Sequence, residues 1–495
     1  MKKLFTIVMF ALTGLMGLNA QTYTTTTLIS GMNGPVAFDI APDGRFFVTY
    51  KGGYALPTVD ATIRVWDANG NAIGIFYDLT DSVNADFERG LLGITLDPDF
   101  NNNHYVYVYY NYNSNSQTGN GDERIRIERF TEVNNVGTQP TIIFDLDVSN
   151  SIAGNHVGGN LHFRPSDPSH IYFTIGDLAY QQSNPTLNYA NKLTNPYGKV
   201  LRISKTPLAP PPTDNPFYDD GNPLATNCDW IWSYGHRNPF DFCFASTTDS
   251  LYISENGYNT WDEMNMGHKG GFYGWANCEG FYLNGSTTTL CNAPGAIDPI
   301  EDWGTPLPAV TGILFYSGQV MSEFDNHVLI ADNDYGRIYD ITLGNAPVYD
   351  QFVSRTQWMD VVTETGGLTT IKQGADGCVY AMKGGYTTNG KIYRICPQGL
   401  GTSELASKSF NLGQPYPNPT NSTSVITYSM QSNSNARIAL YDIFGREVAV
   451  LADGMQTMGD HQLVIDPVQL GLTPGMYFCN MTSEGSTQSV NLVVE

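Results

Sequence analysis

One short pattern recurs six times along this chain: a turn rich in Asp, Asn, Pro or Gly, followed at once by an alternating or aromatic segment. Such a segment is typical of a β-strand, and the residues before it favour tight turns. The aspartates of successive copies lie 51 to 82 residues apart, which is more than a minimal four-stranded unit needs, so loops must carry insertions. The six copies begin at Ala41, Asp97, Pro165, Thr248, Phe324 and Ala375.

Six repeats of this kind favour one architecture, because radial repetition protects the edges of short strands. The sequence therefore predicts an all-β protein whose residues 21–397 form a six-bladed β-propeller. A β-solenoid is the alternative, although its repeats would be shorter and more uniform. No long amphipathic helix competes with this interpretation.

The N-terminus predicts export. Lys2 and Lys3 precede an apolar run over residues 4–18, and Ala20 is a small residue where a signal peptidase would cut. A membrane anchor is the alternative, but a span needs about 20 apolar residues. We interpret residues 1–20 as a cleaved signal peptide and expect no transmembrane segment.

Export permits disulfides, and the chain has seven cysteines. Cys278 with Cys291, and Cys378 with Cys396, would each close a short loop. Cys228 with Cys243 is a weaker pairing. Because the number is odd, at least one thiol should be free, and the absence of a C-x-x-C pair argues against a thiolate zinc site.

The character of the chain changes after Cys396. Residues 398–408 are predicted to be a linker, and residues 409–495 contain short alternating segments that suit a small Ig-like β-sandwich. Three motifs there, at residues 412–419, 441–446 and 474–477, closely resemble the C-terminal sorting domain of the type IX secretion system. The resemblance implies the type IX secretion machinery as a partner and a protein that is secreted or attached to the cell surface. A carbohydrate-binding or adhesive sandwich is the alternative.

Residues 231–275 concentrate polar groups of both signs at the ends of short strands. His236, Arg237 and Asn238 precede an acidic run of Glu255, Asp262 and Glu263. Such groups need partners once water is excluded, which predicts a ligand or metal site. Surface loops around a structural ion are the plainer interpretation. The formal net charge of −23 makes nucleic acid and anionic membranes poor partners.

Motifs spread over the predicted propeller resemble the soluble quinoprotein glucose/sorbosone dehydrogenase family, in the family's order. The family fold is a six-bladed propeller, in agreement with the six repeats. The motifs lie at residues 89–93, 97–100, 155–159, 174–177, 198–203, 235–239, 262–265 and 269–275.

The resemblance implies a pyrroloquinoline quinone (PQQ) cofactor and a histidine that takes the proton from the anomeric hydroxyl of an aldose. By motif position this base is His156, whose ordinary pKa of about 6.5 suits proton transfer near neutral pH. Asp177 would steady it. The resemblance implies that the cofactor is contacted by Glu88, Asn155, Arg237 and Asn238.

The resemblance also implies two calcium sites. Backbone carbonyls of Gly257 and Tyr258 match the site beside the quinone, where family members often have proline in place of Tyr258. Glu263 and the Tyr273 carbonyl match a second, structural site. Hard oxygen ligands of this kind suit Ca²⁺.

The chain departs from the family where cations hold the quinone's carboxylates. Asp334 stands at the family's lysine, and Gly367 and Thr369 stand at its arginine pair. The possible substitutes are Arg337, Arg355 and Lys372. Glu88 stands where dehydrogenases often have glutamine, a variant shared with the hedgehog-interacting-protein branch, which keeps the propeller for binding.

Two functions follow. The first is a secreted, PQQ- and calcium-dependent dehydrogenase that oxidises aldoses at the anomeric carbon and passes electrons to an external acceptor. The second is a non-catalytic surface propeller that binds a glycan or a protein. A hydrolase is a distant third, because no G-x-S-x-G elbow is present and scattered carboxylates do not define a glycosidase pair.

Overall fold

The computed structural model describes residues 21–53, 56, 60–114, 123–148, 154–398, 410–413, 415–430, 432–442, 446–483 and 486–494. The predicted signal peptide, nearly all of the predicted linker, and residues 443–445 of the second C-terminal motif lie outside this part. The chain divides into two compact units, residues 1–397 and 398–495. No described helix is long and apolar enough to cross a membrane.

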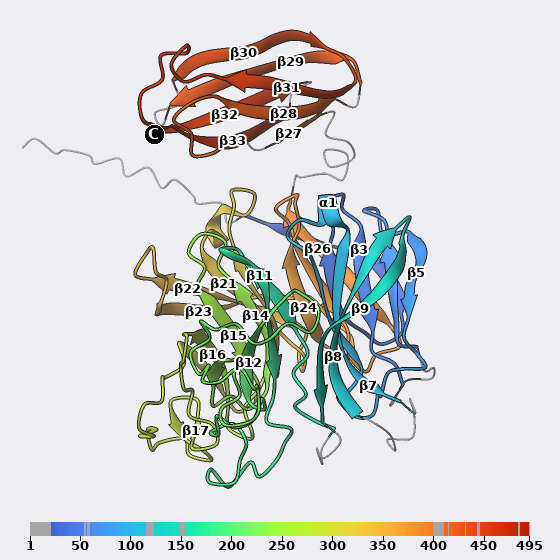
Figure 1. Ribbon diagram of the computed structural model, residues 1–495, viewed down its shortest axis with the longest axis vertical. Helices are drawn as coiled ribbons and strands as arrows, with labels where there is room; N and C mark the ends of the chain where they lie inside the picture. Colours follow the sequence, from blue (N-terminus) through green and yellow to red (C-terminus); the bar gives the residue numbers. More distant parts are fainter. Residues whose placement is uncertain are drawn as a thin grey trace, which may run out of the picture. The chain divides into compact units, whose positions relative to one another are not determined.

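The first unit is a six-bladed β-propeller, as predicted, in which each blade is a four-stranded antiparallel sheet (Figure 1). Its first three blades are β2 (Pro35–Ile40), β3 (Phe46–Tyr50), β4 (Thr62–Trp66) and β5 (Ala72–Asp78); β6 (Leu91–Leu96), β7 (Tyr105–Asn113), β8 (Glu123–Val133) and β9 (Val136–Asp147); and β10 (Leu161–Arg164), β11 (Asp167–Ile175), β12 (Lys199–Ser204) and β13 (Ile231–Tyr234).

The next two blades follow the same order along the chain. They are β14 (Pro239–Phe244), β15 (Leu251–Glu255), β16 (Trp261–Gly267) and β19 (Glu301–Gly304); and β20 (Val310–Tyr316), β21 (His327–Asp332), β22 (Arg337–Gly344) and β23 (Gln351–Asp360). Between β16 and β19 lies a two-stranded insertion, β17 (Cys278–Glu279) with β18 (Tyr282–Leu283). Short helices α1 (Phe100–Asn103) and η1 (Ser322–Phe324) precede β7 and β21.

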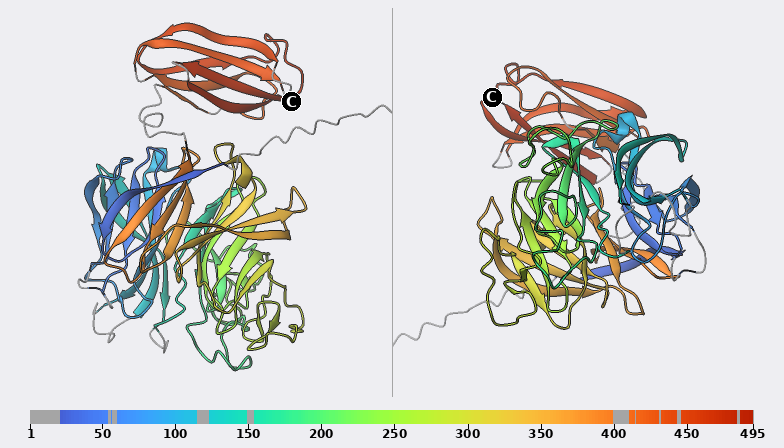
Figure 2. Two further views of the ribbon diagram at one scale, coloured as in Figure 1. Left: turned by 180° about the vertical axis from the view of Figure 1, so that it is seen from behind. Right: turned by 60° about the horizontal axis from the view of Figure 1, so that its bottom comes forward.

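The sixth blade joins the two ends of the propeller. The strand β1 (Tyr23–Met32) pairs antiparallel with β26 (Gly390–Pro397), which is followed across the sheet by β25 (Val379–Lys383) and β24 (Leu368–Gln373). Figure 2 shows β1, in blue, beside the orange strands of this blade. The ring is therefore closed by hydrogen bonds between the first strand and the last.

Each repeated turn of the sequence connects the first and second strands of one blade. Aspartate side chains close these turns: Asp43 Oδ1 accepts from the Arg45 amide at 3.1 Å, and Asp376 Oδ1 accepts from the Cys378 amide at 3.1 Å. These are local contacts that a short Asp-containing segment can make by itself. Because these contacts are local, the sequence alone could predict one such turn for each blade.

Apolar side chains fill the space between every pair of neighbouring blades in the described structure. Phe47 and Phe76 of the first blade pack with Phe100 and Phe130 of the second, with the Phe47 and Phe76 rings 5.3 Å apart. Five further clusters continue around the ring, and the last joins the sixth blade to the first. Burial of these faces stabilises the ring at about 25 cal/mol per Å² of apolar surface.

Two of the three predicted disulfides form, Cys278 with Cys291 and Cys378 with Cys396. The Cys228–Cys243 pairing is wrong. Cys228 lies in the apolar cluster between the second and third blades, and Cys243 packs between the fourth and fifth. The two cysteines are close in sequence but belong to different blades, so they do not meet. Both remain thiols, as does Cys479.

The second unit is a small β-sandwich, as predicted. One sheet contains β27 (Phe410–Leu412), β28 (Ser424–Met430) and β31 (Gly459–Ile465), and the other contains β30 (Glu447–Gln456), β29 (Ser434–Asp442), β32 (Gly475–Ser483) and β33 (Ser486–Val494). Alternate residues of these strands point inward, and Ile426, Leu440 and Leu492 are buried between the sheets.

Candidate functional site

A cavity of about 200 Å³ lies where the six innermost strands meet, and every blade contributes to its wall. The innermost strands β2, β6, β10, β14, β20 and β24 contact one another in sequence and close a ring. Residues at one end of these strands line the cavity, including Ala37, Leu92, Asn160 and Thr311. The propeller therefore gathers residues from distant parts of the chain around one pocket.

His156 and Asp177 form a buried pair beside this cavity. The Nδ1 atom of His156 lies 2.6 Å from Asp177 Oδ1. Asp177 also accepts hydrogen bonds from the Trp275 indole at 2.7 Å, the Asn188 amide at 2.9 Å and the Ala179 backbone N–H at 2.8 Å. Burial tends to raise the pKa of Asp177, but the hydrogen bond from His156, with these donors, holds it below its ordinary value.

This arrangement fixes the orientation of the imidazole. A carboxylate on Nδ1 keeps the proton there and leaves Nε2 to act as an acceptor. No hydrogen bond links Nε2 to any described residue. His156 can therefore accept a proton or a hydroxyl hydrogen bond from a bound ligand.

The loop that carries His156 adopts an unusual backbone conformation. His156 has φ of 53°, in the left-handed region. Its N–H donates to Glu88 Oε2 at 2.5 Å, which ties the loop to the second blade. Gly158 follows with φ of 64°, and a Cβ there would lie 2.3 Å from the Thr174 carbonyl oxygen. The glycine of the motif is thus required by close packing.

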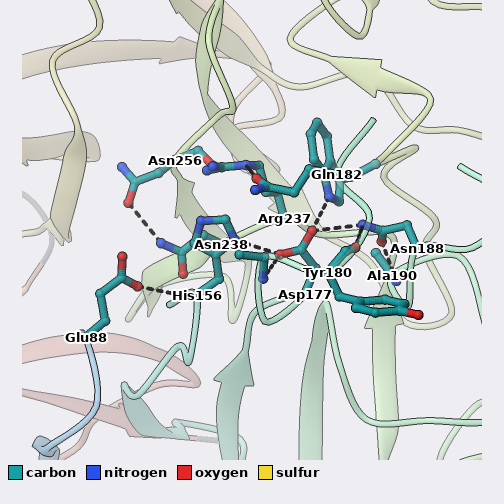
Figure 3. Close-up of polar contacts among 12 residues, drawn as sticks. Glu88, His156, Asp177, Tyr180, Gln182, Asn188, Ala190, Arg237, Asn238 and Asn256 are labelled. Carbon is teal, nitrogen blue, oxygen red and sulfur yellow. Dashed lines mark hydrogen bonds and ion pairs between the residues drawn. The ribbon is translucent and has the colours of Figure 1, made fainter. Parts of the chain in front are cut away.

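Arg237 and Asn238 lie next to this pair (Figure 3). The Arg237 guanidinium lies against the Tyr258 and Trp275 rings, 5.5 and 5.6 Å from their centroids, and its Nε donates to Gln182 at 2.9 Å. Asn238 lines the cavity. Asn155 is only partly buried and does not line it. Two of the four predicted cofactor contacts, Glu88 and Asn238, thus line the cavity, and Arg237 lies behind its wall, hydrogen-bonded to the Asn256 carbonyl.

Three buried carboxylates lie close behind the site, on Glu255, Glu263 and Glu279. Glu279 Oε1 accepts four backbone N–H groups, from Tyr258 at 2.6 Å through Trp261 at 3.2 Å. Asn265 donates to both Glu255 and Glu263. Burial first, and then the negative charge of Glu255, raises the pKa of Glu263 well above its ordinary value. Such a concentration of charge favours a cation.

Two acceptors in this cluster are buried without a described partner, Glu279 Oε2 and Asn265 Oδ1. Unpaired hard oxygens beside repelling carboxylates fit the donor set of Ca²⁺. Tyr258 begins the segment that Glu279 binds, and Gly257 precedes it with its N–H donating to Asp262 Oδ1 at 2.9 Å. The ring of Tyr273 stacks on His236 at 4.6 Å, and His236 Nδ1 lies 2.8 Å from Glu255 Oε2. Of the predicted metal residues, Glu263 thus belongs to the acidic cluster, Tyr258 bonds to it, and Tyr273 reaches it through His236.

The charged residues of the cavity wall are few. Among the described lining residues, Lys51 and Glu88 are the charged ones. Lys51 donates to the Ala85 carbonyl at 2.9 Å. The other polar groups of the wall are amides and hydroxyls, contributed by Asn160, Asn238, Asn256, Asn333, Thr311, Thr369, Thr370 and Tyr386.

The positions where the resemblance implies cations do not supply them. Thr369 lines the cavity, and its buried Oγ1 has no described partner. Asp334 is exposed. A side chain at Gly367 would meet the Asn333 backbone, because a Cβ there would lie 1.7 Å from its carbonyl oxygen.

The three candidate substitutes face elsewhere. Arg337 pairs with Asp360 at 3.2 Å, and Arg355 pairs with Glu301 at 2.6 Å. Lys372 lies 3.5 Å from His162 Nδ1. None of the three lines the cavity among the described residues.

Lys51 provides a pH-dependent test of this wall. Burial lowers its pKa to about 8, and Glu88 and Asp86 oppose the shift. Since an unfolded lysine titrates near 10.4, the unfolded state binds more protons between about pH 8 and pH 10. Relative to Lys51→Met, the wild-type free energy of unfolding should therefore rise by about 3 kcal/mol as pH increases from about 7.5 to 10.5. Urea unfolding at each pH measures this difference. For the exposed control Lys269→Met, the difference in free energy of unfolding from the wild type should not change with pH. If the difference for Lys51→Met does not change with pH either, the lowered pKa of Lys51 is contradicted.

Several residues of the site were not predicted. Glu279 belongs to the acidic region and binds backbone N–H groups there, whereas Asn188 and Trp275 donate hydrogen bonds to Asp177. Lys51 is the cation of the cavity wall. Glu279 directly follows Cys278, so the disulfide prediction came within one residue of it. Lys51 follows the first repeated strand, where a single lysine carries no signal by itself.

The comparisons with known proteins agree with the fold of both units. Residues 32–394 match the Glucose / Sorbosone dehydrogenase family model, and residues 414–495 match the Secretion system C-terminal sorting domain model. The chain is 25% identical over 384 residues to the aldose sugar dehydrogenase of Escherichia coli, covering 74% of this chain and 90% of that protein. It is 31% identical over 269 residues to the quinoprotein glucose dehydrogenase B of Acinetobacter calcoaceticus, covering 51% and 52%.

A solved structure shows the same fold. The PQQ-bound aldose sugar dehydrogenase of Streptomyces coelicolor superposes with a TM-score of 0.54 at 23% identity, covering 76% of this chain and 99% of that one. The propeller, its pocket and the matched family model lead to one conclusion. This chain belongs to the glucose/sorbosone dehydrogenase family and carries a C-terminal secretion sorting domain.

Proposed function

We propose that this protein is exported to the cell surface or beyond by the type IX secretion machinery, and that its propeller binds a neutral sugar in the central cavity. The observation that carries the proposal is the composition of the cavity wall. Amides and hydroxyls dominate it, with one lysine and one glutamate whose charges cancel. Such groups exchange hydrogen bonds with sugar hydroxyls without requiring a charged ligand.

Individual residues support this proposal. The Nε2 atom of His156, held by Asp177, is suited to accept a sugar hydroxyl. Thr369 Oγ1 is buried in the wall without a described partner, so a ligand hydroxyl would satisfy it. Asn238 offers both a donor and an acceptor. In this proposal the acidic region of Glu263 and Glu279 holds Ca²⁺ and keeps the segment of Gly257 and Tyr258 in place.

The residues of this chain do not fit PQQ. The cofactor is a tricarboxylate, and a buried trianion needs several cations around it. Lys51 is the one described lysine or arginine that lines the cavity, and Glu88 lines it too. Arg237 lies nearby, but the negative charge of Asp177 close to it already offsets its positive charge.

The second candidate is the calcium- and PQQ-dependent aldose dehydrogenase activity that the family implies, with an external electron acceptor. One observation favours it. His156 is oriented by Asp177 with Arg237 and Asn238 beside it, which is the arrangement expected of a base that removes a hydroxyl proton.

Calorimetric titration of the full mature chain distinguishes the two functions. Neutral aldoses and PQQ are titrated separately, with Ca²⁺ and with a calcium chelator. Under the first proposal an aldose binds in Ca²⁺, PQQ does not, and Asn238→Ala weakens the sugar roughly tenfold by removing hydrogen bonds. The exposed control Asn69→Ala should bind like the wild type.

Two outcomes would overturn the first proposal. Tight PQQ binding, with aldose-dependent reduction of a dye that His156→Ala abolishes, would establish the dehydrogenase. A folded, calcium-loaded chain that binds no sugar would rule out a sugar pocket.

A further inference from the structure

A second cavity, of about 610 Å³, borders the first site on the side of the β17–β18 insertion. None of its described lining residues is charged, although the whole chain has a net charge of −23. Four asparagines contribute to its wall, together with a tyrosine ring and two prolines. These are Asn259, Asn277, Asn284, Asn292, Tyr258, Pro185 and Pro294.

The two cavities have no described lining residue in common, but Arg237 contacts both walls, since its Nη1 donates to the carbonyl of Asn256 in the first wall at 2.9 Å. Tyr258 lines the second cavity, and its ring lies 5.5 Å from the guanidinium of Arg237 in the first site. Gln182 connects them as well: its side chain accepts from Arg237, and its backbone carbonyl accepts from Asn284 at 3.1 Å. Tyr258 is 38% exposed, so part of its ring remains available to a ligand. A ligand that extends out of the first site past Arg237 would reach this ring.

The insertion that forms the far wall is held firmly. The Cys278–Cys291 disulfide closes it, and the Trp261 ring stacks on Tyr282 at 4.8 Å. The Trp261 indole also donates to the Ser286 carbonyl at 3.0 Å. The cavity is therefore formed in advance, which reduces the entropy lost when a ligand binds.

From this we infer that the second cavity is a subsite for a further sugar unit, so that the ligand is a neutral oligosaccharide. The inference rests on the proposed sugar-binding function. Asparagine amides hydrogen-bond to hydroxyls, and an exposed tyrosine ring packs against the apolar face of a sugar. The uncharged wall offers no partner for acidic or phosphorylated units, which excludes them as preferred occupants.

The test compares ligand length on the full mature chain with Ca²⁺. Glucose, mannose and xylose are titrated beside the tetrasaccharides of the cello-, malto-, manno- and xylo- series. We expect at least one tetrasaccharide to bind tenfold or more tightly than its own monosaccharide. The double variant Asn259→Ala/Asn292→Ala should remove this gain and leave monosaccharide affinity unchanged. Both residues are exposed, so the variant should fold. The matched control is Asn69→Ala/Asn101→Ala, at exposed positions on the first and second blades, and it should bind both lengths like the wild type.

The failures of the two proposals are distinguishable. Equal affinity for monosaccharide and tetrasaccharide, or a length preference that Asn259→Ala/Asn292→Ala leaves intact, would overturn the subsite while the sugar pocket stands. Absence of binding by any sugar of either length, in the folded chain, would overturn both.

Discussion

Replacement of Asp177 by alanine is expected to destabilise the propeller by about 4 kcal/mol and to abolish ligand binding. Asp177 is fully buried and accepts hydrogen bonds from His156, Ala179, Asn188 and Trp275. Alanine would leave these donors without an acceptor in a dry interior, and the imidazole would lose its fixed orientation. Urea unfolding of the full chain measures the first effect, and sugar titration measures the second.

Two variants make this result specific. Asp177→Asn keeps the volume and one acceptor oxygen but turns an N–H₂ group toward donors, so its loss of stability should be intermediate. Asp43→Ala removes a half-exposed carboxylate that pairs with Arg45 at a turn, and should cost about 1 kcal/mol or less. If Asp177→Ala unfolds at the same urea concentration as Asp43→Ala, Asp177 is not the organising acceptor of the site.

Deletion of residues 22–32 should have an effect of at least the same size. These residues include β1, which supplies the fourth strand of the closing blade and buries Ile29 and Met32 between the sixth and first blades. Loss of two buried side chains and of the backbone hydrogen bonds of one strand should lower the free energy of unfolding by more than about 5 kcal/mol. This is comparable to the whole stability of many domains. We expect insoluble protein, or a thermal midpoint at least 15 °C lower, roughly as the entropy of unfolding implies.

Point variants on the same strand separate pairing from packing. Ile29→Ala should cost about 3 kcal/mol through the cavity it leaves, whereas the exposed Thr26→Ala should change stability by less than about 1 kcal/mol. A soluble deletion variant with the wild-type thermal midpoint would show that the ring does not depend on β1.

The blades were predictable because their turns are local. Asp43 and Asp376 each close a turn with an amide two residues away, so the pattern is complete within a few letters of sequence. The sheet partners of β1 were not predictable in the same way. They lie more than 350 residues away, and nothing in Tyr23–Met32 identifies β26 as the neighbour.

The same difference between local and long-range contacts determined which residues of the site could be predicted. His156 and Asp177 are 21 residues apart and were named because a family motif covers both. Lys51 and Thr369 face the same cavity from blades at opposite ends of the chain, so the charge of the wall emerges only when the ring closes. The Cys228–Cys243 pairing failed for the opposite reason: two residues close in sequence were separated by the boundary between blades.

The position of the exit strand determines how the propeller responds to pulling. Force applied to the chain beyond Pro397 enters through β26, which is bonded on one side to β1 and on the other to β25. Tension at this point is therefore shared by two hydrogen-bond ladders, where an edge strand would peel from one. The Cys378–Cys396 bridge adds a covalent path into the strand beside it. A propeller tethered by its C-terminal end would thus resist shear flow at the junction where a tether concentrates stress.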